Sequence, residues 1–261
     1  MNSDFSNWPQ SASELRNAVT CHPERFGVTV VVTSCNRHDL LKTTLESFEQ
    51  FNSFPIDRVL IVEDGPLPGQ LPFNWDRGTP CEWVSTGERV GQIAAIDYVY
   101  SRVKSPFIFH LEDDWEFFAA NFIEKSMIIL LQEPKCLQVW LRAHDDTNNH
   151  PIETDEKSSL GVNWREMKLS YVNEWGEWNG FAFNPGLRRL CDYRKSNGYG
   201  SLAAFDFEQP GSAESKIGIF YKKLGFFAAI LNDNDGHGYV RHIGKGRHVM
   251  PPEYSQDKSS G

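Results

Sequence analysis

Residues 107–115 read Phe107-Ile108-Phe109-His110-Leu111-Glu112-Asp113-Asp114-Trp115, an apolar run that ends in three consecutive acids. Pro106 precedes the run, and its Ile and Phe content predicts a buried β-strand. Unpaired carboxylates are costly to bury, so the three acids need water, a cation or a basic partner. In an open α/β sheet, ligands bind at the carboxyl ends of the strands. The stretch therefore predicts either a divalent-metal site for a phosphate-bearing substrate or a solvated acidic loop.

Two further apolar runs precede this stretch and have the same character. Val28–Thr33 and Arg58–Val62 predict buried parallel strands. Between them, Asp39 is a suitable helix cap, and the apolar residues up to Phe51 recur at helical spacing. A strand, a helix and a strand in this order predict a doubly wound unit. The pattern continues with a short strand at 82–85, helices at 92–103 and 119–132, and a strand at 137–141.

The second half of the chain is less regular. Residues 142–165 are polar and predict a long loop, of the kind that closes over a ligand as a lid. Beyond it we expect strands at 167–172, 181–183 and 226–231, helices at 185–193 and 214–224, and a glycine-rich loop at 232–247. The whole pattern predicts an α/β, Rossmann-like fold: a central, mostly parallel sheet flanked by helices, with a smaller second region.

Composition narrows the class of protein. The 261 residues carry a net charge of −9, which argues against a nucleic-acid partner. Five scattered cysteines without a CxxC pair indicate reduced thiols and a cytoplasmic protein. No stretch approaches the ~20 apolar residues of a membrane span, so no transmembrane segment is expected. We expect an amino-terminal extension at 1–26, one domain at 27–231, and a carboxyl-terminal loop and tail at 232–261.

Motifs in a fixed order resemble those of inverting, family-two-like glycosyltransferases with the GT-A fold. They are VTVVVTSCNRHDLLKTTLESF at 28–48, IVEDG at 61–65, RVGQIAAI at 89–96, LEDDW at 111–115 and AESKIGIFYKKLGFFAAIL at 213–231. LEDDW resembles the DxD motif, although Glu112 replaces its first Asp. The resemblance implies a nucleotide-sugar half at 27–141 and an acceptor half at 142–231. It also implies transfer of a sugar from a UDP- or GDP-sugar to a hydroxyl group of a glycan or another acceptor.

The resemblance assigns roles on the donor side. Thr33 and Asp64 would contact the base and ribose, and Arg37 and Arg89 would face the diphosphate. Asp113 would touch the ribose. The full set of expected donor-binding residues is Thr33, Ser34, Arg37, Asp64, Arg89, Glu112 and Asp113. Asp114 would bind Mn²⁺ or Mg²⁺ directly, completed by His237 or His242.

The remaining roles concern the acceptor. Glu214 is the expected catalytic base, with Asp206 and Glu208 in reserve, because the family's usual Glu-Asp pair is here Glu214-Ser215. Trp175, Trp178 and Asn179 are expected to bind the acceptor, since sugar faces stack on indole rings.

Each role has an ordinary structural alternative. Asp64 is also a common turn residue, Glu214 also suits a helix amino terminus, and Trp178 also suits a packed core. Two other functions stay open: a sugar-phosphate nucleotidyltransferase and a catalytically decayed carbohydrate-binding protein. The turn after Val28–Thr33 has no glycine, which argues against the nucleotidyltransferase. The missing Asp beside Glu214 keeps the decayed protein in consideration.

Overall fold

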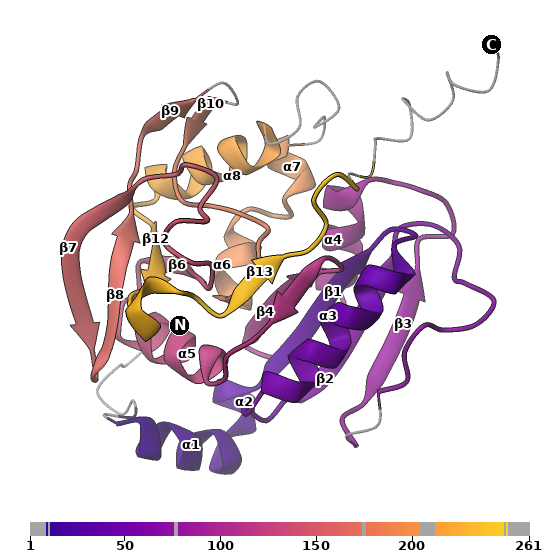
Figure 1. Ribbon diagram of the computed structural model, residues 1–261, viewed down its shortest axis with the longest axis horizontal. Helices are drawn as coiled ribbons and strands as arrows, with labels where there is room; N and C mark the ends of the chain where they lie inside the picture. The colour runs from indigo at the N-terminus through magenta and orange to yellow at the C-terminus, as the bar shows by residue number, and fades with distance from the viewer. Residues whose placement is uncertain are drawn as a thin grey trace.

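The structure is a computed structural model that describes residues 9, 11–75, 78–173, 176–203, 212–247 and 249. In that part of the chain, nine strands form one mixed sheet in the order β3-β2-β1-β4-β11-β6-β12-β8-β7 (Figure 1). Their bounds are β1 Val28–Ser34, β2 Arg58–Glu63, β3 Cys81–Ser85, β4 Phe107–Glu112, β6 Cys136–Trp140, β7 Ile152–Ser159, β8 Val162–Met167, β11 Gly186–Arg189 and β12 Phe227–Leu231. The first four strands in this order are parallel, and so are β6 and β12. The predicted α/β fold with a mostly parallel central sheet is confirmed.

Helices cover both faces of this sheet because the strands are apolar on both faces. Val28, Val30 and Val32 of β1 join one core cluster, and Val31 joins the other. The first cluster contains apolar residues of α1 (Ala12–Cys21), α2 (Pro23–Phe26), α3 (His38–Phe51) and α5 (Phe122–Gln132). The second contains those of α4 (Gln92–Tyr100), α6 (Leu190–Lys195), α7 (Gly200–Ala203) and α8 (Ser212–Lys223). This alternation is the two-residue period expected of a strand with two buried faces.

Strand β11 enters the middle of the sheet in the reverse direction. It pairs antiparallel with β4, where Leu187 faces Phe109, and with β6, where Arg188 faces Gln138. Gly186 has no side chain for a packing reason, since a Cβ there would lie 2.7 Å from the carbonyl oxygen of Val139. The helix predicted at 185–193 is therefore wrong in its first half: a strand comes first, and α6 begins only at Leu190.

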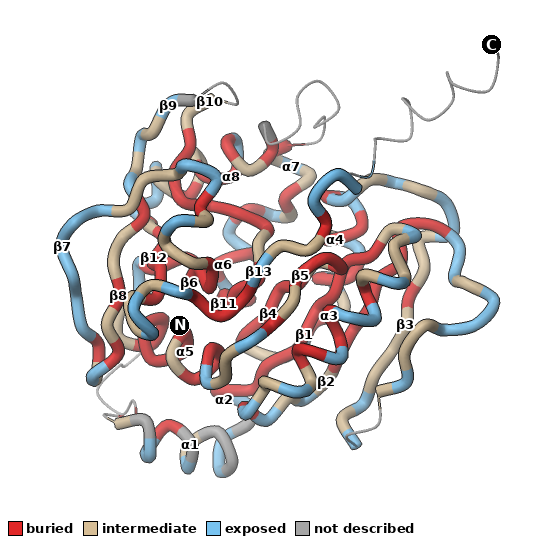
Figure 2. Tube along the Cα trace, viewed as in Figure 1, coloured by how far each residue is buried: buried red, intermediate tan, exposed pale blue. Residues whose placement is uncertain are grey.

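The loop predicted at 142–165 is also wrong in large part. Strands β7 and β8 form an antiparallel hairpin that closes the edge of the sheet beside β12. Figure 2 shows β7 exposed along most of its length, so it has no apolar period that the sequence could reveal. The predicted strand at 167–172 splits into the end of β8 and the start of β9 (Tyr171–Asn173), which pairs with β10 (Gly176–Trp178). No strand forms at 181–183.

The carboxyl-terminal segment returns to the acidic stretch. After the short 3-10 helix η2 (Asn234–Gly236), strand β13 (Val240–His242) pairs antiparallel with β5 (Trp115–Phe117), which follows β4 directly. The predicted loop at 232–247 thus contains a strand (Figure 1). Among the helices of the described residues, none has the length and apolar character needed to cross a membrane.

Candidate active site

The acids of residues 112–114 lie where β4 ends and the chain turns into β5. Asp113 and Asp114 are only 1% and 5% exposed. Helix α3 holds the turn through Thr44, whose hydroxyl donates to the Asp113 carbonyl oxygen at 2.9 Å and accepts from the Trp115 N–H at 3.0 Å. Two carboxylates are therefore fixed, nearly buried, at the carboxyl end of a central strand.

Arg37 forms ion pairs with both of these carboxylates. The residue directly precedes α3, and its Nη1 donates to Asp114 Oδ2 at 2.6 Å. Its Nε donates to Asp113 Oδ2 at 3.3 Å, and its Nη2 is paired with Asp113 Oδ1. Burial works against the charge of Arg37, yet the carboxylates of Asp113 and Asp114 hold its pKa above the usual value. Burial raises the pKa of Asp113 to about 6, although Arg37 opposes this.

His242 reaches the same site from β13. Its Nε2 lies 3.1 Å from Asp114 Oδ2, and its ring packs on Trp115 with centroids 5.1 Å apart. Burial opposes the charge of Asp114, but the hydrogen bond from His242 and the charge of Arg37 lower its pKa. The Ile243 N–H donates to the Asp114 carbonyl oxygen at 2.9 Å. His237, the other predicted histidine, is exposed at the end of η2, and the described residues show no contact between its ring and the acids.

Glu112 faces the opposite side of β4 from its neighbour Leu111. Gln92, the first residue of α4, donates to Glu112 Oε1 at 2.6 Å, and the Trp115 indole donates to Oε2 at 3.1 Å. Burial raises the pKa of Glu112 to about 8, with further contributions from Asp114 and Glu214. The carboxyl groups of Glu112 and Glu214 are about 100 positions apart in sequence. The charge of Glu214 nevertheless contributes to the raised pKa of Glu112, so the fold brings the two groups into the same region.

Glu214 lies in the first turn of α8. Its Oε1 accepts the backbone N–H of Phe183 at 2.7 Å, so the side chain is fixed from outside its own helix. Ser215, which stands where the related motif has Asp, is buried and donates to the Glu177 carbonyl oxygen at 2.7 Å. The two reserve candidates, Asp206 and Glu208, lie outside the described residues.

Other predicted donor-side residues surround the ends of β1 and β2. Asp64 is 7% exposed, and its two oxygens accept the backbone N–H groups of Val90 at 2.7 Å and Gly91 at 3.0 Å. It thus fixes the loop that leads into α4. Thr33 and Ser34 are buried at the end of β1. Arg89 reaches the same turn, since it packs beside Gly65 and its charge acts on the Cys35 thiol.

The predicted acceptor residues have structural partners. Trp178 is 3% exposed and stacks on the His150 ring with centroids 3.8 Å apart, while its indole N–H donates to the Phe181 carbonyl oxygen at 3.1 Å. The Asn179 side chain accepts the Ser170 N–H at 2.8 Å. Neither side chain presents a free face to a sugar in this arrangement. Trp175 lies outside the described residues.

Sequence reasoning missed Trp115 and Arg142. The Trp115 ring separates Glu112 from His242 and touches both. Arg142, 4% exposed, places its guanidinium 5.1 Å from the centre of the same ring and donates to Asp146 Oδ1 at 2.8 Å. Arg142 could have been found from the sequence, because it lies two residues after the end of β6, at the same edge of the sheet as Asp113.

The residues present fit a divalent metal. Two ligands at right angles around an ion of this kind, each about 2.1 Å from it, lie about 3 Å apart. Asp114 Oδ2 and His242 Nε2 are separated by 3.1 Å. Among the described residues there is no group of three or more His, Cys, Asp or Glu side chains able to hold a metal. The protein would therefore supply two ligands, and phosphate and water would supply the others. Arg37 shares the same Asp114 oxygen and would have to move.

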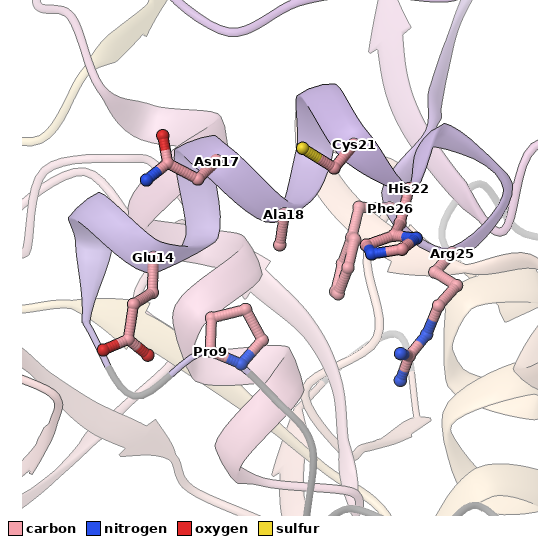
Figure 3. A pocket seen from close by; sticks show the side chains of 8 residues that line it. All are labelled: Pro9, Glu14, Asn17, Ala18, Cys21, His22, Arg25 and Phe26. Atoms are coloured by element: carbon pink, nitrogen blue, oxygen red, sulfur yellow. The ribbon is translucent and has the colours of Figure 1, made fainter.

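A pocket near the amino terminus lies apart from this site. It is lined by Pro9, Glu14, Asn17, Ala18, Cys21, His22, Arg25 and Phe26, from α1, α2 and the segment before them (Figure 3). Because α2 leads directly into the start of β1, the pocket lies at the amino ends of the parallel strands. The acids lie at the carboxyl ends, so the pocket is not part of the candidate site.

The central sheet and its two helical layers define a fold that solved glycosyltransferases share. The chain is similar over 82% of its length to the mannosyltransferase PcManGT from Pyrobaculum calidifontis in complex with GDP-Man and Mn²⁺, with 14% identity, a TM-score of 0.53 and 59% of that chain covered. It is similar over 82% to S. aureus TarS, with 11% identity, a TM-score of 0.55 and 36% of that chain covered. It is similar over 84% of its length to S. aureus TarS 1–349, with 10% identity, a TM-score of 0.53 and 60% of that chain covered.

The chain thus spans less than two thirds of each of these proteins. No family model and no curated protein sequence matches it. At such low identity the likeness concerns the fold.

Proposed function

We propose that the chain is a metal-dependent glycosyltransferase of the GT-A type, which moves a sugar from a UDP- or GDP-sugar to a hydroxyl acceptor with inversion. The observation that carries this proposal is the pairing of Asp114 with His242 at the carboxyl end of β4, beside Arg37 and on the same edge as Glu214. The GDP-Man and Mn²⁺ bound by the mannosyltransferase of similar fold support the same class of donor and metal.

Asp114 and His242 would hold the ion. An imidazole ligand favours Mn²⁺ over Mg²⁺. When bound, the ion would neutralise the diphosphate that leaves as the sugar–oxygen bond breaks. Arg37 and Arg89 are the cations of this edge that would bind the same phosphates, because a guanidinium suits phosphate oxygens bidentately. In the free protein Arg37 instead holds the two acids together, so donor binding would exchange a carboxylate partner for a phosphate partner.

Glu214 would accept the proton of the acceptor hydroxyl group. The Phe183 N–H holds one of its oxygens in place, which sets the orientation in which the carboxylate would meet the hydroxyl. Glu112, whose pKa of about 8 favours the neutral form at pH 7, avoids placing a second charge beside Glu214. Attack from the side opposite the departing diphosphate inverts the configuration of the sugar carbon.

Ligand-induced stabilisation tests the donor site. Thermal unfolding with UDP or GDP, with and without Mn²⁺, should show stabilisation that needs both components. A ligand at 100 times its Kd adds about 2.7 kcal/mol. The Asp114→Asn variant should lose this stabilisation, whereas Asp155→Asn on the exposed strand β7 should keep it. Equal stabilisation of the Asp114→Asn variant by Mn²⁺ and nucleotide would remove the metal from this site.

Turnover tests the base. Glu214→Gln should keep Mn²⁺-dependent nucleotide binding and lose roughly 10²–10⁴-fold in kcat, the usual contribution of a general base. Glu153→Gln, on β7, is the matched control and should turn over like the wild type. Full turnover by Glu214→Gln would assign the base to another acid. Binding without turnover in the wild type itself would favour the catalytically decayed binding protein.

A further inference from the structure

One peptide group links a buried arginine to the proposed base. The carbonyl oxygen of Ala182 accepts a hydrogen bond from Arg188 Nη2 at 3.2 Å. The N–H of Phe183 donates to Glu214 Oε1 at 2.7 Å. This carbonyl and this N–H belong to the same planar amide, at its opposite ends. Arg188 and Glu214 therefore act on one rigid unit without an ion pair between them.

Within the described residues, the segment that contains this amide is not paired with any strand of a sheet. Residues 180–183 form neither helix nor strand. Their carbonyl groups are bound by side chains instead: Gly180 accepts from the Trp140 indole at 3.0 Å, Phe181 from the Trp178 indole at 3.1 Å, and Ala182 from Arg188. Each donor is a buried side chain of the surrounding sheet region. The orientation of the last amide thus depends on Arg188.

Stability does not explain an arginine at this position. Arg188 is 2% exposed, lies over the Phe181 ring at 5.5 Å, and shows no ion pair with a carboxylate among the described residues. Its Nε and Nη1 are buried without a hydrogen-bond partner in that part of the chain, and its other polar neighbours are the hydroxyl groups of Tyr100 and Tyr199. Burying a cation in this way is costly, and an apolar side chain would fill the space at lower cost.

We propose that Arg188 is a positioning residue for the proposed base. Its cation draws electron density toward the Ala182 carbonyl oxygen, which makes the Phe183 N–H a stronger donor, and it holds that N–H in line with Glu214. The carboxylate oriented in this way would then take the proton of the acceptor hydroxyl. This inference rests on the proposed function, in which Glu214 takes the proton.

The test is a double-mutant cycle in the full-length protein. Arg188→Met keeps the length of the side chain and removes its donors. We expect kcat to fall about tenfold, the effect of one lost buried hydrogen bond, with KM for the nucleotide-sugar and Mn²⁺-dependent stabilisation by nucleotide unchanged. In the Glu214→Gln background the same substitution should cause no further loss, because Arg188 acts only through Glu214. Arg194→Met on the exposed side of α6 is the control and should change neither background.

Each outcome decides between roles. A tenfold loss in both backgrounds, or no loss in either, overturns the proposal. If Arg188→Met does not fold, Arg188→Lys replaces it, since lysine retains a cationic donor: a partial kcat loss that disappears in the Glu214→Gln background supports the proposal, and any other pattern overturns it. Full turnover by Glu214→Gln alone would instead defeat the proposed base, which keeps the two failures distinguishable.

Discussion

Position 244 requires a glycine because the Asp114 side chain occupies the space that a Cβ would need. A methyl group built on Gly244 would overlap the Asp114 carboxylate, and φ at this residue is not in the left-handed region. Any larger residue must therefore displace either the carboxylate or the segment after β13. The requirement is for space beside the whole Asp114 side chain, including the oxygen that faces His242 and Arg37.

Gly244→Ala should therefore weaken Mn²⁺-dependent nucleotide binding by at least about tenfold, because a 1.4 kcal/mol disturbance of one metal ligand has that effect. Calorimetric titration of nucleotide in the presence of Mn²⁺ measures the change. Gly69→Ala, where a Cβ meets nothing within 4 Å, is the matched control. Unchanged affinity in Gly244→Ala would show that Asp114 does not need its present position.

At the scale of elements, the junction between β6 and β7 contains a histidine that the fold keeps neutral. His150 stacks on Trp178 and lies near Arg142. Burial, aided by the charge of Arg142, lowers the pKa of His150 to about 4. A histidine in the unfolded chain titrates near 6.5. Between these values the unfolded chain binds more protons, so the free energy of unfolding falls as the pH falls from about 6.5 to 4.

His150→Phe should remove this dependence, because phenylalanine retains a flat ring against Trp178 and binds no proton. Relative to the variant, the wild type should lose at most about 3 kcal/mol across that pH range. Urea unfolding of both proteins at several pH values gives the difference. Parallel stability curves for the two proteins would contradict the neutral state of His150 in the fold.

The elements also show where sequence reasoning fails for physical reasons. Val28–Thr33 and Phe107–Leu111 are recognisable because both faces of their strands are buried, and such strands are continuously apolar. Strand β7 is an exposed edge, so its polar sequence is that of a loop. Residues 186–189 follow a proline and read as a helix start, but pairing with β4 and β6 overrides that local preference.

The candidate site was predictable to a similar extent. The need of the acids for a cation or basic partner follows from burial cost alone, and Arg37 with His242 meets it. Which histidine would reach Asp114 depends on the pairing of β13 with β5, a contact between distant parts of the chain. The exposure of Trp178 and the contacts of Arg188 depend on the packing of segment 180–183, which no local pattern encodes.

At the scale of the whole molecule, the two halves defined by the resemblance share one sheet. Strand β11, from the second half, lies between β4 and β6 of the first. A fragment of residues 27–141 would leave the facing edges of β4 and β6 unpaired. We expect it to show no cooperative thermal transition, whereas the full chain should unfold in a single one, as judged by circular dichroism. Cooperative unfolding of the fragment would show that the first half is an independent folding unit.

The 128 positions that separate Asp114 from His242 also set a temporal order for this protein. During synthesis, Arg37 and both aspartates leave the ribosome long before the histidine that faces them. A nascent polypeptide that has been translated only through β12 would contain Arg37 and both aspartates but would lack His242, one of the two proposed ligands. We infer that the proposed metal site is complete only after β13 has been synthesised and has paired with β5.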